Sequence, residues 1–217
     1  MRDEKQITIA LAKGRLAEDT MDILERCGVD VSAARNPKRK LIVYDAEQQF
    51  RFLLVKPSDV PTYIHHGVAD MGIAGKDTLL EAALPLYEML DLQLGKCRLC
   101  VCGYAEGSQP SPTLTVAKKR IASKYPRVAR EYFESKGEAV EIIKLNGSVE
   151  IAPMLGLSDA IVDIVESGRT LRDNELEVLE EICECSARVV VNRASLKTKR
   201  TAIQRVITQM RKQVQGN

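Results

Sequence analysis

The sequence of 217 residues lacks any long hydrophobic run, and no segment approaches the ~18 apolar residues that a membrane-spanning helix needs. Its N-terminus also lacks a basic stretch followed by an uninterrupted apolar segment, so no secretory signal is expected. Neither an internal repeat nor a low-complexity tract is present, and a composition that is 45% hydrophobic and 29% charged excludes a disordered chain. A chain of this length needs no metal or disulfide to support its core. We therefore expect a soluble, cytoplasmic globular protein.

The last part of the chain lacks acidic residues: from position 186 onward it carries eight Lys or Arg and no Asp or Glu. Such a basic segment is typical of contact with nucleic acid, with an anionic ligand or with an acidic partner. Apolar residues recur there at helical spacing, at Leu196, Ile203, Val206, Ile207, Met210 and Val214. This periodicity favours an amphipathic helix whose basic face is solvated, and we expect the chain to bind neither nucleic acid nor membrane.

Cysteine is scarce, with six residues in the chain: Cys27, Cys97, Cys100, Cys102, Cys183 and Cys185. The spacing of Cys97 and Cys100 is that of a zinc knuckle or a redox motif, which the Cys-Glu-Cys segment at 183–185 would complement. Five of the six fall in strand-like sequence, however, where alternation places Cys100 and Cys102 on one face. The favoured interpretation is reduced thiols packed as small apolar residues, with no protein-bound metal site.

Strand-like and helix-like segments alternate along the chain, which predicts an α/β fold. Strands are expected at 7–12, 40–45, 50–55, 68–75, 87–94, 98–104, 119–123, 139–145 and 159–165, followed by a long extended region at 176–192. Helices are expected at 20–27, from an N-cap at Asp59 to Gly67, at 126–135, shortly after the glycine turn at 147, and over the basic C-terminus.

The densest cluster of small residues and proline, at 103–113, is typical of a linker or a boundary between lobes. We predict two α/β lobes, with the C-terminal helix returning to the first. The first lobe comprises residues 1–95 plus 187–217. The second comprises residues 96–186 and carries a candidate phosphate-binding loop.

The strongest local signal for function is the segment from Asp159 to Thr170, in which an apolar strand leads into a Ser-Gly-Arg-Thr loop. Gly168 permits close approach of the backbone, and N–H groups together with the Ser167 and Thr170 hydroxyls can converge on a phosphate. Asp163 would accept hydrogen bonds from ribose hydroxyls. The pattern resembles the signature of proteins that bind phosphoribosyl diphosphate (PRPP), although residue 164 is Ile where that signature has a second acid. A tight turn is an equally compatible interpretation of this motif alone.

Several further segments, in the order in which they occur, are similar to the ATP phosphoribosyltransferase family, HisG. They are ALAKGRL, DVPTYIHHGVADMGIAGKD, KRIASKYP and KLNGSVEIAPMLGLSDAIVDIVESGRTL. The likeness runs from about residue 7 to residue 171 and continues more loosely to the end. It implies two α/β lobes around a cleft, the type II architecture of periplasmic binding proteins. It also implies the short form of the family, without a C-terminal histidine-binding domain.

The resemblance implies an enzyme in which adenine N1 of ATP displaces pyrophosphate from PRPP, giving phosphoribosyl-ATP in the first step of histidine biosynthesis. The transition state gains positive charge at the ribosyl centre and negative charge on the departing pyrophosphate, so the site needs carboxylates near the sugar and cations near the pyrophosphate. Adenine N1 carries no proton, so alignment and charge stabilisation suffice without a general base. Mg²⁺ is expected to arrive with PRPP and ATP, held mostly by phosphate oxygens and water.

Two arginines are the expected catalytic residues. Arg15 follows the first strand, where ligands of α/β sheets bind, and its planar fork suits a pair of phosphate oxygens. Arg39 is the second candidate, although the flanking Lys38 and Lys40 are also compatible with a solvated loop. Lys56 has charge without bidentate geometry, so we leave its role open.

Two further sets of residues complete the site that the resemblance implies. The expected PRPP-binding residues are Glu150, Asp163, Glu166, Ser167, Gly168, Arg169 and Thr170. The expected nucleotide-binding residues are Lys13, Gly14, Asp70 and Gly72. Spacing alone leaves alternatives open: Glu150 also suits a helix start, and Asp70 and Gly72 suit a structural role, since a glycine inside a strand indicates close approach of backbone or ligand.

The resemblance to the short form implies a partner, the regulatory subunit HisZ, which is similar to a histidyl-tRNA synthetase catalytic domain. We expect a hetero-oligomer with HisZ, and a homodimer with little histidine response when the chain is alone.

Two other functions remain compatible with a two-lobed α/β chain. A small-molecule binding protein or effector domain would capture a ligand without releasing pyrophosphate. A base-salvage phosphoribosyltransferase would use PRPP with a free purine or pyrimidine, but Ile164 in place of the second acid counts against it.

Overall fold

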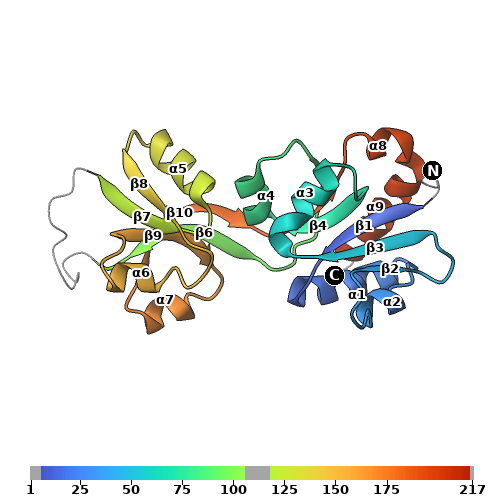
Figure 1. Ribbon diagram of the computed structural model, residues 1–217, viewed down its shortest axis with the longest axis horizontal. Helices are drawn as coiled ribbons and strands as arrows, with labels where there is room; N and C mark the ends of the chain where they lie inside the picture. The colour runs from blue at the N-terminus through green and yellow to red at the C-terminus, as the bar shows by residue number, and fades with distance from the viewer. Residues whose placement is uncertain (1–5, 106–117, 216–217) are drawn as a thin grey trace. The chain divides into compact units, whose positions relative to one another are not determined.

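The computed structural model describes residues 6–105 and 118–215, apart from the Arg15 side chain. The chain forms two compact units: unit 1 is Met1–Gly95 together with Ser186–Asn217, and unit 2 is Lys96–Cys185. Each unit is a β-sheet with helices packed on it (Figure 1). Every helix within the described residues falls short of the length and apolarity needed to cross a membrane.

Unit 1 is built on a six-stranded sheet in the order β2-β3-β1-β4-β11-β5. Its strands are β1 (Ile7–Ala12), β2 (Ile42–Tyr44), β3 (Phe50–Val55), β4 (Met71–Gly75), β5 (Tyr87–Asp91) and β11 (Ala187–Val191). β1 runs parallel to β3 and β4, so the carboxyl ends of these three strands share one edge of the sheet. Every residue of β1 is buried, which explains why this strand is an almost uninterrupted apolar run.

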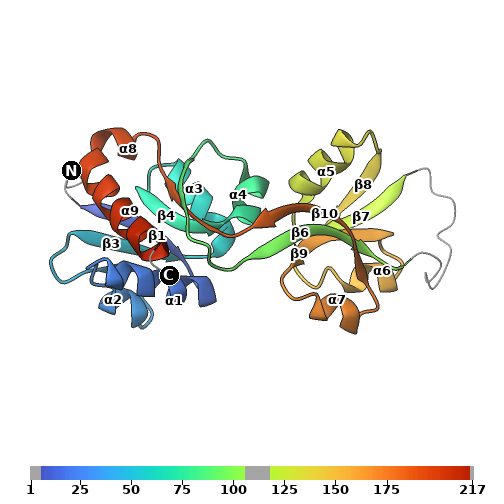
Figure 2. The same cartoon turned by 180° about the vertical axis from the view of Figure 1, so that it is seen from behind.

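Helices cover both faces of the unit 1 sheet. They are α1 (Arg15–Arg26), α2 (Ser32–Arg35), the 3-10 turn η1 (Pro57–Asp59), α3 (Val60–His65), α4 (Lys76–Ala82), α8 (Ser195–Thr198) and α9 (Arg200–Gln215). α9 packs beside α1 (Figure 2) and buries Ile203, Val206, Ile207 and Met210 in the core that contains Leu24 and Phe52. The amphipathic helix predicted for the basic segment is thereby confirmed. A second core, with Ile64 and Leu53, lies under α3 on the other face.

Unit 2 is built on a five-stranded sheet in the order β10-β6-β9-β7-β8. Its strands are β6 (Cys97–Gly103), β7 (Lys119–Ser123), β8 (Val140–Lys144), β9 (Ala160–Val165) and β10 (Glu177–Cys185). β7 is parallel to β8 and β9, whereas β6 is antiparallel to its neighbours β9 and β10. The carboxyl ends of β7, β8 and β9 therefore share one edge.

Two cores enclose the unit 2 sheet. α5 (Pro126–Ser135) covers one with Phe133 and Val162, and α6 (Ile151–Met154) and α7 (Arg169–Asp173) cover the other. Cys100 and Cys102 are fully buried together on the α6 and α7 face, as alternation along β6 predicted. Burial raises the pKa of Cys102 to about 12, so this thiol stays protonated and packs as an apolar residue.

Three predicted element boundaries are corrected by the structure. α1 begins at Arg15 rather than near position 20, because Gly14, with φ of 113°, already turns the chain into the helix. Asp59 precedes α3 without a capping hydrogen bond from its side chain, which instead accepts one from the Ser58 hydroxyl. The extended region 176–192 is interrupted at Ser186, because β10 belongs to the unit 2 sheet and β11 to the unit 1 sheet.

The segment 103–113 is not the boundary between the units. The division falls earlier, between Gly95 and Lys96, and Gly103 is the last residue of β6 within unit 2. Residues 106–113 lie outside the described part of the chain.

Candidate functional site

The carboxyl edge of the unit 1 sheet carries several of the predicted cationic residues. Lys13 follows β1, and its backbone N–H donates to the carbonyl of Val55 at 3.0 Å, which holds it beside the end of β3. Gly14 then reverses the chain with a φ of 113° that suits glycine, and its carbonyl accepts from Ala17 N–H at 2.9 Å. Arg15 is the first residue of α1, and its side chain lies outside what the structure describes.

Arg39 reaches the same edge from a different part of the chain. β2 is antiparallel to β3, so the residues before β2 lie beside the carboxyl end of β3, where Leu54 N–H donates to Leu41 C=O at 2.9 Å. Arg39 is exposed in a turn closed by a hydrogen bond from Lys40 N–H to Pro37 C=O.

Three cations at this edge are available to a ligand. Lys13, Arg39 and Lys56 are exposed, and none has an ion pair or side-chain hydrogen bond to a described residue. Ligands of open α/β sheets bind outside the carboxyl ends of the strands, so this is the edge of unit 1 suited to an anion.

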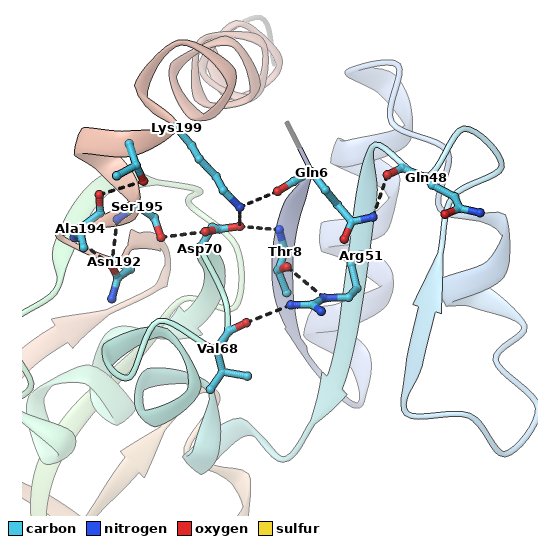
Figure 3. A network of polar contacts seen from close by, with 11 residues as sticks. Gln6, Thr8, Gln48, Arg51, Val68, Asp70, Asn192, Ala194, Ser195 and Lys199 are labelled. Carbon is cyan, nitrogen blue, oxygen red and sulfur yellow. Dashed lines mark hydrogen bonds and ion pairs between the residues drawn. The ribbon is translucent and has the colours of Figure 1, made fainter. Parts of the chain in front are cut away.

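Asp70 lies at the opposite edge of the unit 1 sheet, at the amino end of β4. It is 5% exposed, and both of its carboxylate oxygens bind donors inside the unit (Figure 3). One carboxylate oxygen accepts from Thr8 N–H at 2.8 Å and pairs with Lys199 Nζ at 2.9 Å, while the other accepts from Ser195 Oγ at 2.7 Å. This placement favours the structural alternative for Asp70 over contact with a nucleotide.

The Asp70 network fastens the C-terminal helices to the sheet. Lys199, between α8 and α9, also donates from Nζ to Gln6 C=O at 2.6 Å (Figure 3). A single ammonium thus connects the start of α9 to the residues directly before β1 and β4. Asn192 extends the network: its Nδ2 donates to Ile64 C=O at 2.7 Å, and its Oδ1 accepts from the backbone N–H groups of Ala194 and Ser195 at the start of α8.

Gly72 is required by packing inside unit 1. A Cβ at this position would lie 2.6 Å from the Ala10 carbonyl oxygen on β1 and 2.9 Å from Ile64 Cδ1 on α3. The close approach that the sequence indicated is therefore made by backbone and core atoms, and Gly72, like Asp70, is separate from the cations at the carboxyl edge.

The carboxyl edge of the unit 2 sheet gathers the predicted PRPP-binding residues. Glu166, Ser167 and Gly168 follow β9, and Glu150 ends the connection that follows β8. Asp163 lies on β9 itself, partly buried, in register with Cys100 of β6. The structure thus brings these residues, which are up to eighteen positions apart in the chain, to one edge of one sheet.

The loop from Glu166 to Thr170 has the conformation that its glycine predicted. Gly168 adopts the left-handed conformation, with φ of 70° and ψ of 9°, and α7 begins at the next residue. Ser167 Oγ accepts from Arg169 N–H at 3.4 Å, which leaves its own hydroxyl proton free to donate. Arg172 stabilises the loop, because its Nη1 donates a hydrogen bond to Ser167 C=O at 3.3 Å.

The side chains of this loop face solvent. Ser167 and Thr170 are exposed, and Arg169 is 82% exposed with only a 3.7 Å ion pair to Asp173. Asn174 Nδ2 fixes the Thr170 carbonyl at 2.8 Å without engaging its hydroxyl. Two hydroxyls and a guanidinium are therefore presented from a fixed backbone, an arrangement that suits a phosphate.

Lys124 is a cation that the sequence reasoning did not select. It follows β7 at the same edge of unit 2 and is exposed. The preceding residue, Ser123, is fully buried; its hydroxyl donates to Val162 C=O at 2.6 Å and accepts from Tyr125 N–H at 2.8 Å, which makes this corner rigid. The available signal was a lysine directly after a predicted strand, at 119–123; the position after a strand was used in the sequence for Arg15 only.

The titratable side chains of the described residues form no group of three His, Cys, Asp or Glu arranged to hold a metal ion. All six cysteines are free thiols.

Known proteins are similar to this chain along most of its length. The family model described as HisG: ATP phosphoribosyltransferase matches residues 56–212. The ATP phosphoribosyltransferase of Lachnospira eligens is 53% identical over 213 residues, which cover 97% of this chain and 98% of that protein. The enzyme of the same name from Caldanaerobacter subterraneus subsp. tengcongensis is 50% identical over 210 residues, with coverages of 97% and 98%.

Solved structures give the same result for the fold. A chain of the ATP phosphoribosyl transferase (HisG:HisZ) complex from Thermotoga maritima matches with a TM-score of 0.83 and 38% identity, covering 97% of this chain and 98% of that one. The VFT2 domain of BvgS from Bordetella pertussis matches in fold alone, with a TM-score of 0.56, 10% identity and coverages of 94% and 87%. The predicted two-lobe α/β fold of the type II periplasmic-binding-protein class is confirmed. With more than half of its length matched by the family model and its relatives about half identical end to end, the chain belongs to the HisG family of ATP phosphoribosyltransferases.

Proposed function

We propose that this ATP phosphoribosyltransferase binds PRPP at the carboxyl edge of unit 2 and transfers its phosphoribosyl group to adenine N1 of ATP, releasing pyrophosphate. The transfer is the first step of histidine biosynthesis, the activity of the HisG family. The observation that carries the PRPP assignment is the loop from Glu166 to Thr170, with Gly168 in the left-handed conformation and two exposed hydroxyls beside it.

The loop binds a phosphate of PRPP through donors that are already in place. Ser167 and Thr170 donate their hydroxyl protons, and Arg169 supplies a guanidinium with little competition, because its ion pair to Asp173 is long and exposed. Gly168 keeps the backbone N–H groups accessible, since no Cβ covers them. Glu166, which directly follows β9 at this edge, is assigned to the same set of PRPP-binding residues.

The ribose is held by the carboxylates at the same edge. Asp163 and Glu150 are both partly buried, so each presents fixed acceptors for the ribose hydroxyls. The same negative charges favour the oxocarbenium character that develops at the anomeric carbon. Adenine N1 attacks this carbon as the bond to pyrophosphate breaks, and the electron pair leaves with the pyrophosphate.

Charge on the leaving pyrophosphate is stabilised by cations, and we assign this role to Arg15 and Arg39. Arg39 is exposed, and its side chain has no ion pair with any residue that the structure describes, so binding an anion breaks no ion pair within that part of the chain. Lys13 and Gly14, at the carboxyl edge of unit 1, are assigned to the nucleotide. We assign neither Asp70 nor Gly72 to the nucleotide. The Asp70 carboxylate binds donors of the protein itself, and the space beside the Gly72 Cα is filled by Ala10 and Ile64.

We expect Mg²⁺ to bind to the protein together with its substrates, PRPP and ATP. The carboxylates of Glu150, Asp163 and Glu166 are oxygen donors of the kind that Mg²⁺ accepts, in the company of phosphate oxygens and water. When bound, the ion neutralises phosphate charge and so favours departure of the pyrophosphate.

We further propose that the chain works in the cytoplasm with a HisZ regulatory subunit and forms a homodimer when alone. Support for the partner is the 0.83 TM-score to a chain of the HisG:HisZ complex, of which the match covers 98%. Light scattering of the purified chain tests the homodimer: a monomeric mass at micromolar concentration would contradict it.

The activity is tested by measuring pyrophosphate release from PRPP and Mg²⁺ with ATP, and in parallel with free adenine, guanine or uracil. The protein is assayed alone and co-expressed with a HisZ-type subunit. We expect release with ATP, matched by phosphoribosyl-ATP. Release with a free base instead would identify a salvage enzyme, and binding of ligands without release in either preparation would identify a binding protein.

A further inference from the structure

Three cysteines meet where the chain enters and leaves unit 2. Cys97 is the first residue of β6 and directly follows Lys96, the first residue of unit 2. Cys185 is the last residue both of β10 and of unit 2. β6 and β10 run side by side (Figures 1 and 2). They form an antiparallel pair in whose register Cys97 lies directly opposite Cys185. The third thiol, Cys183, has its sulfur 3.9 Å from that of Cys185.

We propose that Cys97 and Cys185 form a redox modification site, in which exchange with a low-molecular-weight disulfide joins them in a reversible cross-strand disulfide. The bond would connect the two ends of unit 2 and close almost all of that unit into one covalent loop. The proposal concerns a site away from the substrate-binding residues and stands independently of the proposed function.

The register makes this bond sterically accessible. Residues directly opposite each other in an antiparallel ladder have Cα atoms about 4.5–5.5 Å apart. Disulfides in proteins span about 4.4–6.8 Å between Cα atoms, so the pair requires no displacement of the backbone. The side chains already interact, because a hydrogen bond between the Cys97 and Cys185 thiols contributes to raising the pKa of Cys185.

Cys183 is the competing partner for Cys185, but its position in the strand is less favourable. The two lie at i and i+2 on β10, and an extended strand separates such Cα atoms by about 6.6 Å, near the upper limit for a disulfide. Cross-strand bonding to Cys97 is therefore the geometry that the structure assigns. The remaining thiols of unit 2, Cys100 and Cys102, are fully buried and have no access to an oxidant.

Exposure sets the order of the two chemical steps. Cys97 is partly exposed, whereas Cys185 is 3% exposed, so the Cys97 thiolate is the one that meets a small disulfide RSSR. Its attack forms a Cys97–SR mixed disulfide and releases RS⁻. Cys185, which loses its thiol proton as it attacks, then forms a bond to the Cys97 sulfur and releases the second RS⁻. The two cysteines together lose two electrons and two protons, and RSSR is reduced to two RSH.

The test is to incubate the folded full-length chain with oxidised glutathione, block free thiols, and map peptides without reduction. Trypsin cuts after Lys96 and Arg98, which separates Cys97 from Cys100 and Cys102. We expect the Cys97 peptide to be linked to the peptide that contains Cys183 and Cys185, with loss of two free thiols per chain and recovery on reduction.

Single variants identify the partners and provide controls. Cys183→Ser and Cys27→Ser are expected to keep the link, whereas Cys97→Ser and Cys185→Ala are expected to abolish it. The partly exposed Cys97 is the primary test position, because a substitution there leaves the buried core intact. A second readout is denaturant unfolding, in which oxidation is expected to raise the midpoint of the parent and of Cys183→Ser but not of Cys97→Ser. Six free thiols after oxidation, or a link that survives Cys97→Ser and disappears in Cys183→Ser, would overturn the proposal.

Discussion

At the scale of single residues, the two acids singled out in the sequence have opposite environments. Asp70 is nearly inaccessible and binds three protein donors, whereas Asp163 is partly buried near the carboxyl end of β9, two residues before that strand ends and the exposed loop begins. The sequence alone did not separate these roles, since both acids accompany apolar strands with a nearby glycine. The difference depends on Thr8, Ser195 and Lys199, which are remote from Asp70 in the chain and adjacent to it only after folding.

Asp70→Asn is expected to destabilise the protein while leaving the ATP KM of the folded variant unchanged. The Asp70 and Lys199 side chains are 7% and 11% exposed, so removing the carboxylate leaves a buried ammonium unpaired, at a cost of about 3 kcal/mol. Denaturant unfolding measures the loss, with the exposed Asp59→Asn as a control. An unaltered free energy of unfolding combined with a raised ATP KM would return Asp70 to the nucleotide site.

Arg39 and Lys40 are exposed cations in the same turn, so substitutions at these two positions can be compared directly. Arg39→Ala, measured by single-turnover kinetics with a HisZ-type subunit present, is expected to lower the chemical rate more than the substrate affinity. Arg39→Lys should restore the rate only in part, because an ammonium lacks the planar fork of the guanidinium. Lys40→Ala, which removes a neighbouring exposed charge, is the control; equal effects of Arg39→Ala and Lys40→Ala would indicate general electrostatics rather than a specific role for Arg39.

At the scale of elements, an ion-pair cluster ties α5 to the edge strand β10. The Glu180 carboxylate accepts from Lys136 Nζ and from the Tyr132 hydroxyl. These hydrogen bonds, that of Lys136 first, lower the pKa of Glu180 from its ordinary value of 4.5. Because the folded pKa is the lower one, the cluster contributes stability above about pH 4.5, and this contribution is lost as the pH falls through the folded pKa.

Glu180→Gln is therefore expected to be less stable than the parent at neutral pH and equally stable in acid. The free energies of unfolding of both proteins, measured by denaturant titration at a series of pH values, should converge as the pH falls through the lowered folded pKa of Glu180. Exposure of the pair keeps the difference small and sensitive to salt. A difference that stays constant across this range would show that Glu180 acts through packing instead of charge.

Local patterns predicted the elements more accurately than their boundaries. The hairpin of β2 and β3, the start of α5 at Pro126 and the C-terminal amphipathic helix follow from residue periodicity, and the structure confirms them. The start of α1 was missed because it depends on the conformation of Gly14. The region 176–192 was predicted as one extended segment rather than two strands, although the predicted lobes already separated 96–186 from 187–217. Neither property is encoded in the spacing of apolar residues.

At the scale of the whole molecule, the chain leaves unit 1 at Gly95 and returns to it at Ser186, so unit 2 is an insertion within unit 1. The lobes stated from the sequence, 1–95 plus 187–217 and 96–186, describe such an insertion, whereas the composition signal at 103–113 lies inside unit 2. Both crossings occur next to continuous strands, β6 and β10. The order of family motifs placed the PRPP loop, Glu150 and Asp163 in one unit, and parallel pairing of β8, β7 and β9 accounts for their common edge.

Regulation by a separate subunit is a prediction about this whole-molecule organisation. Histidine is titrated into the purified chain and into the chain co-expressed with a HisZ-type subunit, with pyrophosphate release as the readout. Little inhibition is expected for the chain alone and clear inhibition for the complex, because histidine sensing is assigned to the partner and must be coupled across an interface. Strong inhibition of the chain alone, without competition against either substrate, would contradict regulation in trans.

The central claim, that the loop at 166–170 binds a phosphate of PRPP, is tested most directly by equilibrium titration of PRPP with Mg²⁺ against the folded protein. Thr170→Ala removes one exposed hydroxyl without disturbing the loop, whose Thr170 carbonyl remains fixed by Asn174. The account predicts that binding weakens by about 1–3 kcal/mol, roughly five- to 150-fold in Kd. Thr201→Ala, an exposed threonine on α9 in unit 1, is the control and should bind PRPP as the parent does. Equal PRPP affinity for the parent, Thr170→Ala and Thr201→Ala would contradict the assignment of this loop.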